Sequence, residues 1–389
     1  EEETTGSVGG NIGYSDFGLM LGFNLQEKNF FGTGNTVGIG INKNIYSEVY
    51  NLSFMDPYAT KDGVSLGYNL YFRETDYGEF NVANYLTNSN GFGAQFGYPT
   101  SDITRLGFNL TYDKTDIDVG TLPAREIYDF VSKEGNVFET VTAQFSWQRV
   151  TLNRGLFPTA GSSTVVSLSS TIPGSDLSYY RTNIRQRYYR PLSQNFVFGF
   201  QGEIGYLDAY GDTEETPFFQ NFYAGGPRSL RGFESNTLGP RSTDAPCYEF
   251  NYEEETCPNL LDIDGDGELD SPYINPYANS TSRYRDRPIG GNIKVEGSIQ
   301  LIFKLPFIED QRSLRSALFF DFGNVFSNNC KEYQINCAEP SIEDLRYSYG
   351  VGVTWITGFG PLSLAIAKPT NAGPRERTEA VSYTHLTLP

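Results

Sequence analysis

Hydrophobic and polar residues alternate with a period of two along most of this chain. That period is typical of β-strands with one apolar face and one polar face. The alternating stretches, joined by turns rich in Gly, Asp and Pro, are residues 7–14, 18–26, 36–46, 47–55, 63–72, 91–97, 106–112, 137–150, 163–172, 179–190, 196–206, 294–305, 314–326, 347–356 and 362–367. With the C-terminal residues added, the pattern predicts about sixteen strands, within the range of bacterial outer-membrane barrels.

Short links alternate with long ones between these stretches, as turns and loops do at the two ends of a membrane barrel. Most stretches are long enough for a tilted membrane-spanning strand, which needs roughly 9–11 residues. No apolar run reaches the roughly 18–20 residues of a membrane helix. We therefore predict an all-β fold: a transmembrane antiparallel β-barrel formed by residues 1–389 as a single domain, with a polar link at residues 121–136 and no helical domain.

Composition favours a membrane barrel over a soluble globule. Aromatic residues make up 15% of the chain and there are 41 glycines but only two methionines. Barrels use Tyr and Phe at the membrane interfaces and Gly where strands bend. The net charge of −18 argues against a nucleic-acid partner, which requires a basic surface. Much of the acid lies in predicted loops, at residues 249–255 and 262–270, where it keeps them solvated.

One stretch breaks the strand pattern, residues 221–240, NFYAGGPRSLRGFESNTLGP, hereafter the signature loop. Gly and Pro at its start cannot continue a ladder. Its centre carries a fixed positive charge (Arg231), a residue free to adopt positive φ (Gly232) and an aromatic ring (Phe233). We predict that residues 210–290 form a long extracellular loop whose signature segment folds into the barrel lumen, where Arg231 requires an acidic partner.

The segments GGPRSLRGF and ESNTLGP of this loop resemble the signature of the outer-membrane assembly insertases, the family of β-barrel assembly factors. The resemblance extends over about residues 4–379, in matching order and spacing. It includes NFFGTGNTVGIG (29–40), DPYATKDGVSLGYNLYF (56–72), NRGLFPTAGS (153–162), TIPGSDLSYY (171–180), GGN (290–292) and FFDFGNVF (319–326).

The resemblance implies that the protein folds β-barrel proteins and inserts them into the bacterial outer membrane through a lateral seam between its first and last strands. It also implies the partners: nascent barrel substrates, outer-membrane lipids including lipopolysaccharide, and accessory periplasmic lipoproteins of an assembly complex. The sequence begins abruptly at EEETT without a signal peptide. We therefore expect a mature fragment from which N-terminal periplasmic domains are absent.

The first predicted strand, SVGGNIGY at residues 7–14, is weakened by Gly9, Gly10 and Gly13. Glycine lowers strand stability through backbone entropy and lost cross-strand packing. A frayed terminus, or a bend that barrel curvature requires, is one interpretation. The family resemblance adds another, in which this strand, with Ile12 on it, is a seam that opens to pair with substrate strands.

The last predicted strand departs from the family, whose barrels end on an alternating strand with a terminal aromatic residue. Here residues 380–389 read AVSYTHLTLP, with the only histidine, His385, and a final Pro389. Proline removes a ladder donor. We expect this tail to be non-native sequence, although Val381, Tyr383 and Leu386 are compatible with a strand.

Asp321 is the predicted partner of Arg231, because its neighbours Phe320 and Phe322 would face lipid and leave Asp321 in the lumen. Glu296 is the second candidate. The resemblance implies that the loop arginine locks against acids on these two strands. It places the second acid nearer Gln300 than Glu296, so that contact stays open.

The four cysteines form two close pairs in polar, turn-rich segments: Cys247 with Cys257, and Cys330 with Cys337. In an oxidising compartment this spacing favours two local disulfides, while four free thiols are the alternative. A separate acidic run, DIDGDGELD, resembles the start of a calcium loop, with candidate ligands Asp262, Asp264, Asp266 and Asp270. Tyr273 stands where the bidentate Glu belongs, so an unliganded acidic loop is the competing interpretation.

No other cofactor is indicated, and nothing in the sequence points to an enzyme. The single histidine lies in the tail, and neither a metalloprotease, a nucleophile-elbow nor a P-loop motif is present. Two other functions remain as alternatives to assembly: outer-membrane translocation of a secreted partner protein, and a passive porin. The secretion class would carry a plug helix before the barrel, and a porin would show a charged constriction.

Overall fold

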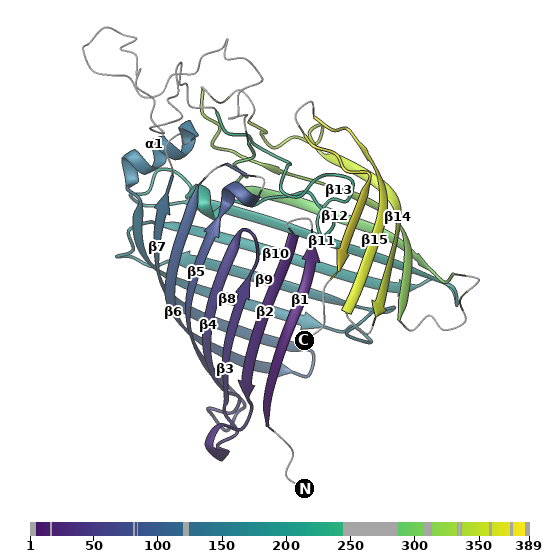
Figure 1. The fold of residues 1–389 in the computed structure, drawn as a ribbon, viewed down its shortest axis with the longest axis horizontal. Helices are drawn as coiled ribbons and strands as arrows, with labels where there is room; N and C mark the ends of the chain where they lie inside the picture. Colours follow the sequence, from purple (N-terminus) through teal and green to yellow (C-terminus); the bar gives the residue numbers. More distant parts are fainter. Residues whose placement is uncertain are drawn as a thin grey trace.

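The computed structural model describes residues 5–15, 18–80, 82–83, 85–119, 124–243, 287–305, 308, 313–332, 334, 337–357, 360–373 and 376–385. Within these residues the chain forms one closed antiparallel barrel, in which each strand pairs with its neighbours in sequence (Figure 1). The predicted all-β barrel of about sixteen strands is therefore confirmed. The calcium-like run and the Cys247–Cys257 pair lie outside the described residues.

The strands are β1 (Gly6–Ser15), β2 (Gly18–Glu27), β3 (Thr36–Lys43), β4 (Ser47–Asp56), β5 (Ser65–Asp76), β6 (Leu86–Ser101), β7 (Thr104–Asp118), β8 (Val137–Val150), β9 (Gly161–Thr171), β10 (Tyr179–Pro191), β11 (Phe196–Ala209), β12 (Ile293–Phe303), β13 (Leu314–Phe326), β14 (Arg346–Thr357), β15 (Gly360–Thr370) and β16 (Val381–His385). The helical segments are η1 (Phe30–Gly32), η2 (Tyr77–Phe80), α1 (Arg125–Glu134) and η3 (Phe218–Gln220).

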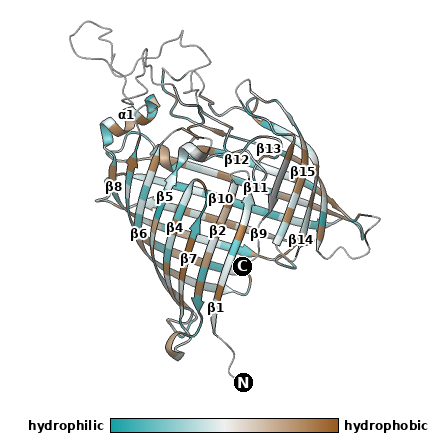
Figure 2. Ribbon diagram, in the orientation of Figure 1, coloured by the Kyte–Doolittle hydropathy of each residue, from teal (hydrophilic) through white to brown (hydrophobic). Residues whose placement is uncertain are grey.

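Alternation along the strands separates a lipid-facing surface from a polar lumen. On β13, Leu318 and Phe320 are exposed, whereas Phe319 and Asp321 are buried on the opposite face. The same alternation gives the strands their succession of brown and teal residues in Figure 2. Apolar side chains on the outer face and paired backbone groups within a closed ladder are what a bilayer requires of a spanning sheet.

The predicted polar link 121–136 contains a short helix, α1, which the sequence analysis did not identify. Ile127 and Phe130 are spaced three residues apart and are both buried on one face of the helix. Acidic Glu126 lies in the first turn and basic Lys133 in the last, which suits the helix dipole. Packing of this short apolar face against neighbouring loops stabilises a helix that is too short to persist alone.

The long links lie at one end of the barrel, where α1, η2, η3 and the arms of the signature loop pack together (Figure 1). We call this packed region the cap. Its hydrophobic core consists of Ala83, Tyr85, Ile117, Ile127, Phe130, Phe138, Leu177, Tyr179, Leu207, Phe218, Phe222, Ala224, Leu230, Phe233, Leu238, Ile289 and Val325. The signature loop therefore enters the barrel anchored to the cap.

Candidate functional site: the signature loop and the seam

The predicted ion pair between Arg231 and Asp321 is present and bidentate. Arg231 Nε donates to Asp321 Oδ2 and Nη2 donates to Oδ1, each at 2.7 Å. The backbone N–H of Arg231 also donates to Oδ2, at 3.3 Å. The Asp321 side chain is fully buried and that of Arg231 is 16% exposed. Such a shielded fork-to-carboxylate pair fixes orientation as well as charge.

Two further residues hold the Arg231 guanidinium, and sequence reasoning missed both. Ser298 on β12 accepts a hydrogen bond from Nη2 at 3.1 Å, because Ser298 and Asp321 are directly opposite in the β12–β13 register. The ring of Phe319 lies beneath the guanidinium, 3.4 Å from its carbon to the ring centroid. Phe319 shares the lumen face of β13 with Asp321, so strand parity alone could have identified it.

Glu296, the second candidate acid, does not pair with Arg231 in the described structure. Its Oε2 accepts a 2.5 Å hydrogen bond from Ser229 in the signature loop, and its Oε1 lies 3.2 Å from Lys294 Nζ. Gln300 donates to Ser298 Oγ at 3.1 Å and so supports the arginine indirectly. The direct Glu296–Arg231 contact, which the sequence left open, is therefore not formed between these two described residues, although Glu296 does bind the loop.

Gly232 and Phe233 explain why the loop takes this path. Gly232 has φ +92°, and a Cβ there would lie 3.2 Å from Ala367 Cβ and 3.4 Å from Ser348 Cβ. Only glycine suits both the positive φ and this close approach to the wall. Phe233 is fully buried in the cap core, and its backbone C=O accepts from Gly226 N at 3.0 Å.

The signature loop also contacts the link between β15 and β16, here called the connector (residues 371–380). Phe233 forms an isolated bridge with Thr378, and the N–H of Glu379 donates to Gly232 O at 2.9 Å. The connector leads directly into β16, where Val381–His385 pairs with β15. Residues of the suspected tail thus form a strand, as their alternation allowed. The loop that holds Arg231 is joined by hydrogen bonds to the chain entering the last strand.

The seam lies between β1 and β16, the first and last strands. Among the described residues, which end at His385, the registered β1–β16 pair is Tyr14 opposite His385, whereas β1 pairs with β2 over ten residues. Figure 1 shows β1 beside the C-terminal strands. Among the predicted seam residues, Ile12 is 59% exposed on the outer face, and a Cβ at Gly9 would meet nothing within 4 Å. Gly10 is exposed and Gly13 buried, as their places on opposite faces require.

The remaining predicted sites have separate outcomes. Cys330 and Cys337 form a disulfide in the β13–β14 link, confirming that pair. Within the described part of the chain, no group of three or more His, Cys, Asp or Glu side chains is placed to hold a metal. Over the same residues, no helix has the length and apolarity to span a bilayer.

The fold and this site define a transmembrane β-barrel whose lumen holds an inward-folded loop, locked by a buried arginine–aspartate pair. The Omp85 superfamily domain model matches residues 29–384. The chain therefore belongs to the Omp85 superfamily, and it is an integral outer-membrane protein.

Relatives and a solved structure agree with this assignment. The chain is 29% identical to the outer membrane protein assembly factor BamA of Neisseria meningitidis, over 98% of this chain and 47% of that protein. It is 22% identical to the sorting and assembly machinery component 50 homolog of Mus musculus, over 90% of this chain and 64% of that protein. The crystal structure of Haemophilus ducreyi BamA lacking POTRA domains 1–3 matches with a TM-score of 0.80 at 28% identity, covering 100% of this chain and 71% of that one. The chain spans about half of the Neisseria protein.

Proposed function

We propose that this barrel assembles other outer-membrane β-barrels by opening between β1 and β16 and pairing its exposed strand edges with incoming strands. The observation that carries the proposal is that β1 and β16 meet as the first and last strands of the barrel, where the described residues, which end at His385, contribute one registered pair. An exposed strand edge templates further strands by β-augmentation. Because insertion satisfies backbone groups and buries the substrate's apolar face, the process needs neither ATP nor a catalytic residue.

The named relatives support this proposal, since the Neisseria protein is an assembly factor for outer membrane proteins and the mouse protein a component of a sorting and assembly machinery. The proposed partners are nascent barrel substrates, outer-membrane lipids including lipopolysaccharide, and accessory periplasmic lipoproteins. The loop lock has a clear role in this scheme. It keeps the wall formed by β12 and β13 rigid while the seam between β16 and β1 opens.

A reversible crosslink across the seam tests the proposal. Tyr14→Cys with His385→Cys would join β1 to β16 at their registered pair, and Val8→Cys with Leu25→Cys would join β1 to β2 at another. Each variant is joined to the POTRA domains of a BamA relative and reconstituted in liposomes, and heat-resistant folding of a small substrate barrel is followed.

We expect the oxidised seam crosslink to abolish acceleration of folding and reduction to restore it, whereas the β1–β2 crosslink has little effect. Equal folding with the seam locked or unlocked would contradict a lateral-opening mechanism. Steady ion conductance without accelerated folding in the uncrosslinked barrel would favour a porin, and export of a soluble partner would favour the secretion class.

A further inference from the structure

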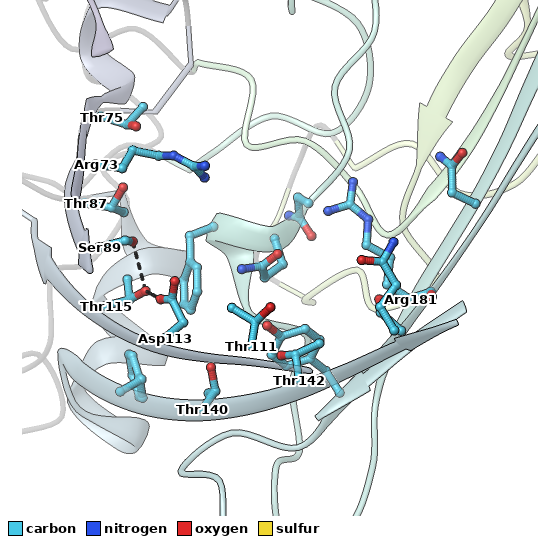
Figure 3. Close-up of a pocket in the computed structure, with 18 of the residues that line it drawn as sticks. Arg73, Thr75, Thr87, Ser89, Thr111, Asp113, Thr115, Thr140, Thr142 and Arg181 are labelled. Carbon is cyan, nitrogen blue, oxygen red and sulfur yellow. Dashed lines mark hydrogen bonds between the residues drawn. The ribbon is translucent and has the colours of Figure 1, made fainter. Parts of the chain in front are cut away.

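A cavity of about 690 Å³ lies in the lumen beneath the cap (Figure 3). Its walls are the inner faces of β5 to β10, and one side is closed by Phe219 and Gln220 together with Asn221 and Tyr223 from the start of the signature loop. The loop lock at Arg231 does not line it. The cavity is thus separate from the lock and seam described above.

Two arginines reach into this cavity from different strands, Arg73 from β5 and Arg181 from β10 (Figure 3). Among the described residues, neither guanidinium has an ion-pair partner or a hydrogen-bond acceptor. Each instead lies over an aromatic ring: Arg73 is 5.4 Å from the Tyr71 centroid, and Arg181 is 4.2 Å from that of Phe222. Their N–H donors are therefore available to a ligand.

The nearby acids are already occupied. Asp113 accepts hydrogen bonds from the hydroxyls of Tyr71 and Thr115. A third lining arginine, Arg185, lies 3.2 Å from Glu203, which also approaches Lys294. The lining itself carries three arginines and one aspartate, a positive surplus in a chain whose net charge is −18. Charges inside a walled cavity attract counter-ions more strongly than exposed ones.

The rest of the lining suits a ligand rich in hydroxyl groups. Asn221 belongs to this lining, and its buried Oδ1 has no hydrogen-bond partner among the described residues. Aromatic faces are supplied by Tyr77, Phe138, Tyr179, Phe219 and Tyr223. Neutral polar side chains also line the cavity, among them Thr140, Thr142, Gln144, Ser167 and Ser169.

We propose that this cavity binds a phosphorylated sugar. Guanidinium groups bind phosphate through parallel N–H donors, which accounts for Arg73 and Arg181. The hydroxyl and amide groups of the lining match the hydroxyl groups of a sugar, which inorganic phosphate lacks. The headgroup of a phosphorylated glycolipid and a soluble sugar phosphate present the same chemistry.

Occupancy of this site would stabilise the inward position of the signature loop. Phe222, against which Arg181 stacks, pairs with Gly291 on the returning arm of the long loop. Asn221 and Tyr223 both donate to Ile289 O, at 3.1 and 3.3 Å. A ligand that contacts Arg181 and Asn221 therefore connects the barrel wall to both arms of the loop.

Calorimetric titration of the purified barrel with glucose 6-phosphate, in phosphate-free buffer at low salt, tests the site. We expect binding at least tenfold tighter than that of glucose or of inorganic phosphate. Arg181→Gln and Arg73→Gln should each weaken it about tenfold or more. A second arm presents vesicles containing a phosphorylated glucosamine glycolipid. Arg181-dependent binding in either arm supports the site, and the arm that binds more tightly identifies the source.

Arg187→Gln is the matched control. Arg187 lies on the same lumen face of β10 and carries the same charge, but it lies outside this cavity's lining. Its replacement should leave affinity unchanged, while heat-resistant migration reports that every variant is folded. An equal loss of affinity in Arg187→Gln would show that binding depends only on the overall charge of the lumen, and it would overturn the proposal. So would equal affinity for glucose and glucose 6-phosphate, or no binding in either arm. None of these measurements depends on assembly activity.

Discussion

Arg377 and Glu234 join the connector to the signature loop in two ways. The backbone N–H of Glu234 donates to Arg377 O at 3.0 Å, and Arg377 Nη1 lies 3.3 Å from Glu234 Oε2. The connector leads into β16, one side of the seam. The position of the loop tip and the position of β16 are therefore coupled through backbone hydrogen bonds. A change at the Arg231–Asp321 pair can reach the seam through these contacts.

The first prediction concerns that backbone contact. Glu379→Pro removes the N–H that donates to Gly232 O. We expect a looser β16 and, in the background of Tyr14→Cys with His385→Cys, a rate of seam disulfide formation changed severalfold. Glu379→Ala keeps the N–H, so the difference between the two variants isolates the backbone contact.

Arg377→Ala should have a small effect, because its ion pair is solvent-exposed and such pairs contribute about 0–1 kcal/mol. If Glu379→Pro and Glu379→Ala change the disulfide rate equally, the backbone coupling is absent.

The second prediction concerns the lock itself. Arg231→Ala leaves the buried Asp321 carboxylate without its partner, and Asp321→Ala leaves the guanidinium unpaired. Breaking a buried pair in this way costs about 3–5 kcal/mol. We expect each single change to lower the unfolding free energy and assembly activity, and the double variant to be little worse than either. A double-mutant cycle measured by urea titration in lipid gives the coupling, and simple additivity would count against a direct pair.

The third prediction compares two glycines. Gly232→Ala forces a side chain into positive φ and against Ala367, which should cost about 1–3 kcal/mol and displace the loop. Gly9→Ala on β1 meets nothing within 4 Å and should leave stability unchanged or slightly raised. Thermal unfolding followed by heat-modifiable migration distinguishes the two. An equal loss of stability in the two variants would show that the signature loop does not require glycine at position 232 for its positive φ.

Strand parity accounts for what the sequence could predict of the site. In FFDFGNVF, alternation alone places Asp321 in the lumen and Phe320 towards lipid, and the structure agrees. Ser298 could not be found in this way, because the register between β12 and β13 depends on the intervening turn rather than on either strand's pattern. Strand parity could not decide between Glu296 and Gln300 either, since both share one face with Ser298.

Elements outside the membrane were harder to predict. Helix α1 has only ten residues, shorter than the window over which helical periodicity is distinct, and its stability comes from contacts with distant loops. Strand β6 was expected at residues 91–97 but spans Leu86–Ser101. Its added N-terminal residues are polar except for Leu86, and they remain extended because β7 pairs with them up to Asp118. Backbone pairing with β7 therefore keeps this part of β6 extended, although its sequence lacks the alternating apolar pattern of a strand.

The last prediction concerns a buried carboxylate in the cap. The carboxylate of Glu126 in α1 accepts hydrogen bonds from the backbone N–H of Thr243, at 3.0 and 2.9 Å, and from the Thr243 hydroxyl, at 2.6 Å. Burial raises the pKa of Glu126 above its ordinary value despite these bonds. Its protonated form is therefore favoured in the folded state, so the contact gains stability as pH falls from neutrality through the raised pKa towards 4.5. Hydrogen-exchange protection of α1 amides should rise over that range.

Glu126→Gln should remove this pH dependence, because the neutral amide mimics the protonated acid at every pH. It should also protect α1 at neutral pH at least as well as the parent, since Gln Oε1 still accepts from Thr243. Glu134→Gln at the end of the same helix changes the charge equally and serves as the control. Two outcomes would contradict this prediction: protection of α1 in the parent that falls on acidification, and protection that rises equally in Glu126→Gln. Either would mean that ionised Glu126 does not destabilise the helix, because its hydrogen bonds to Thr243 outweigh the cost of its burial.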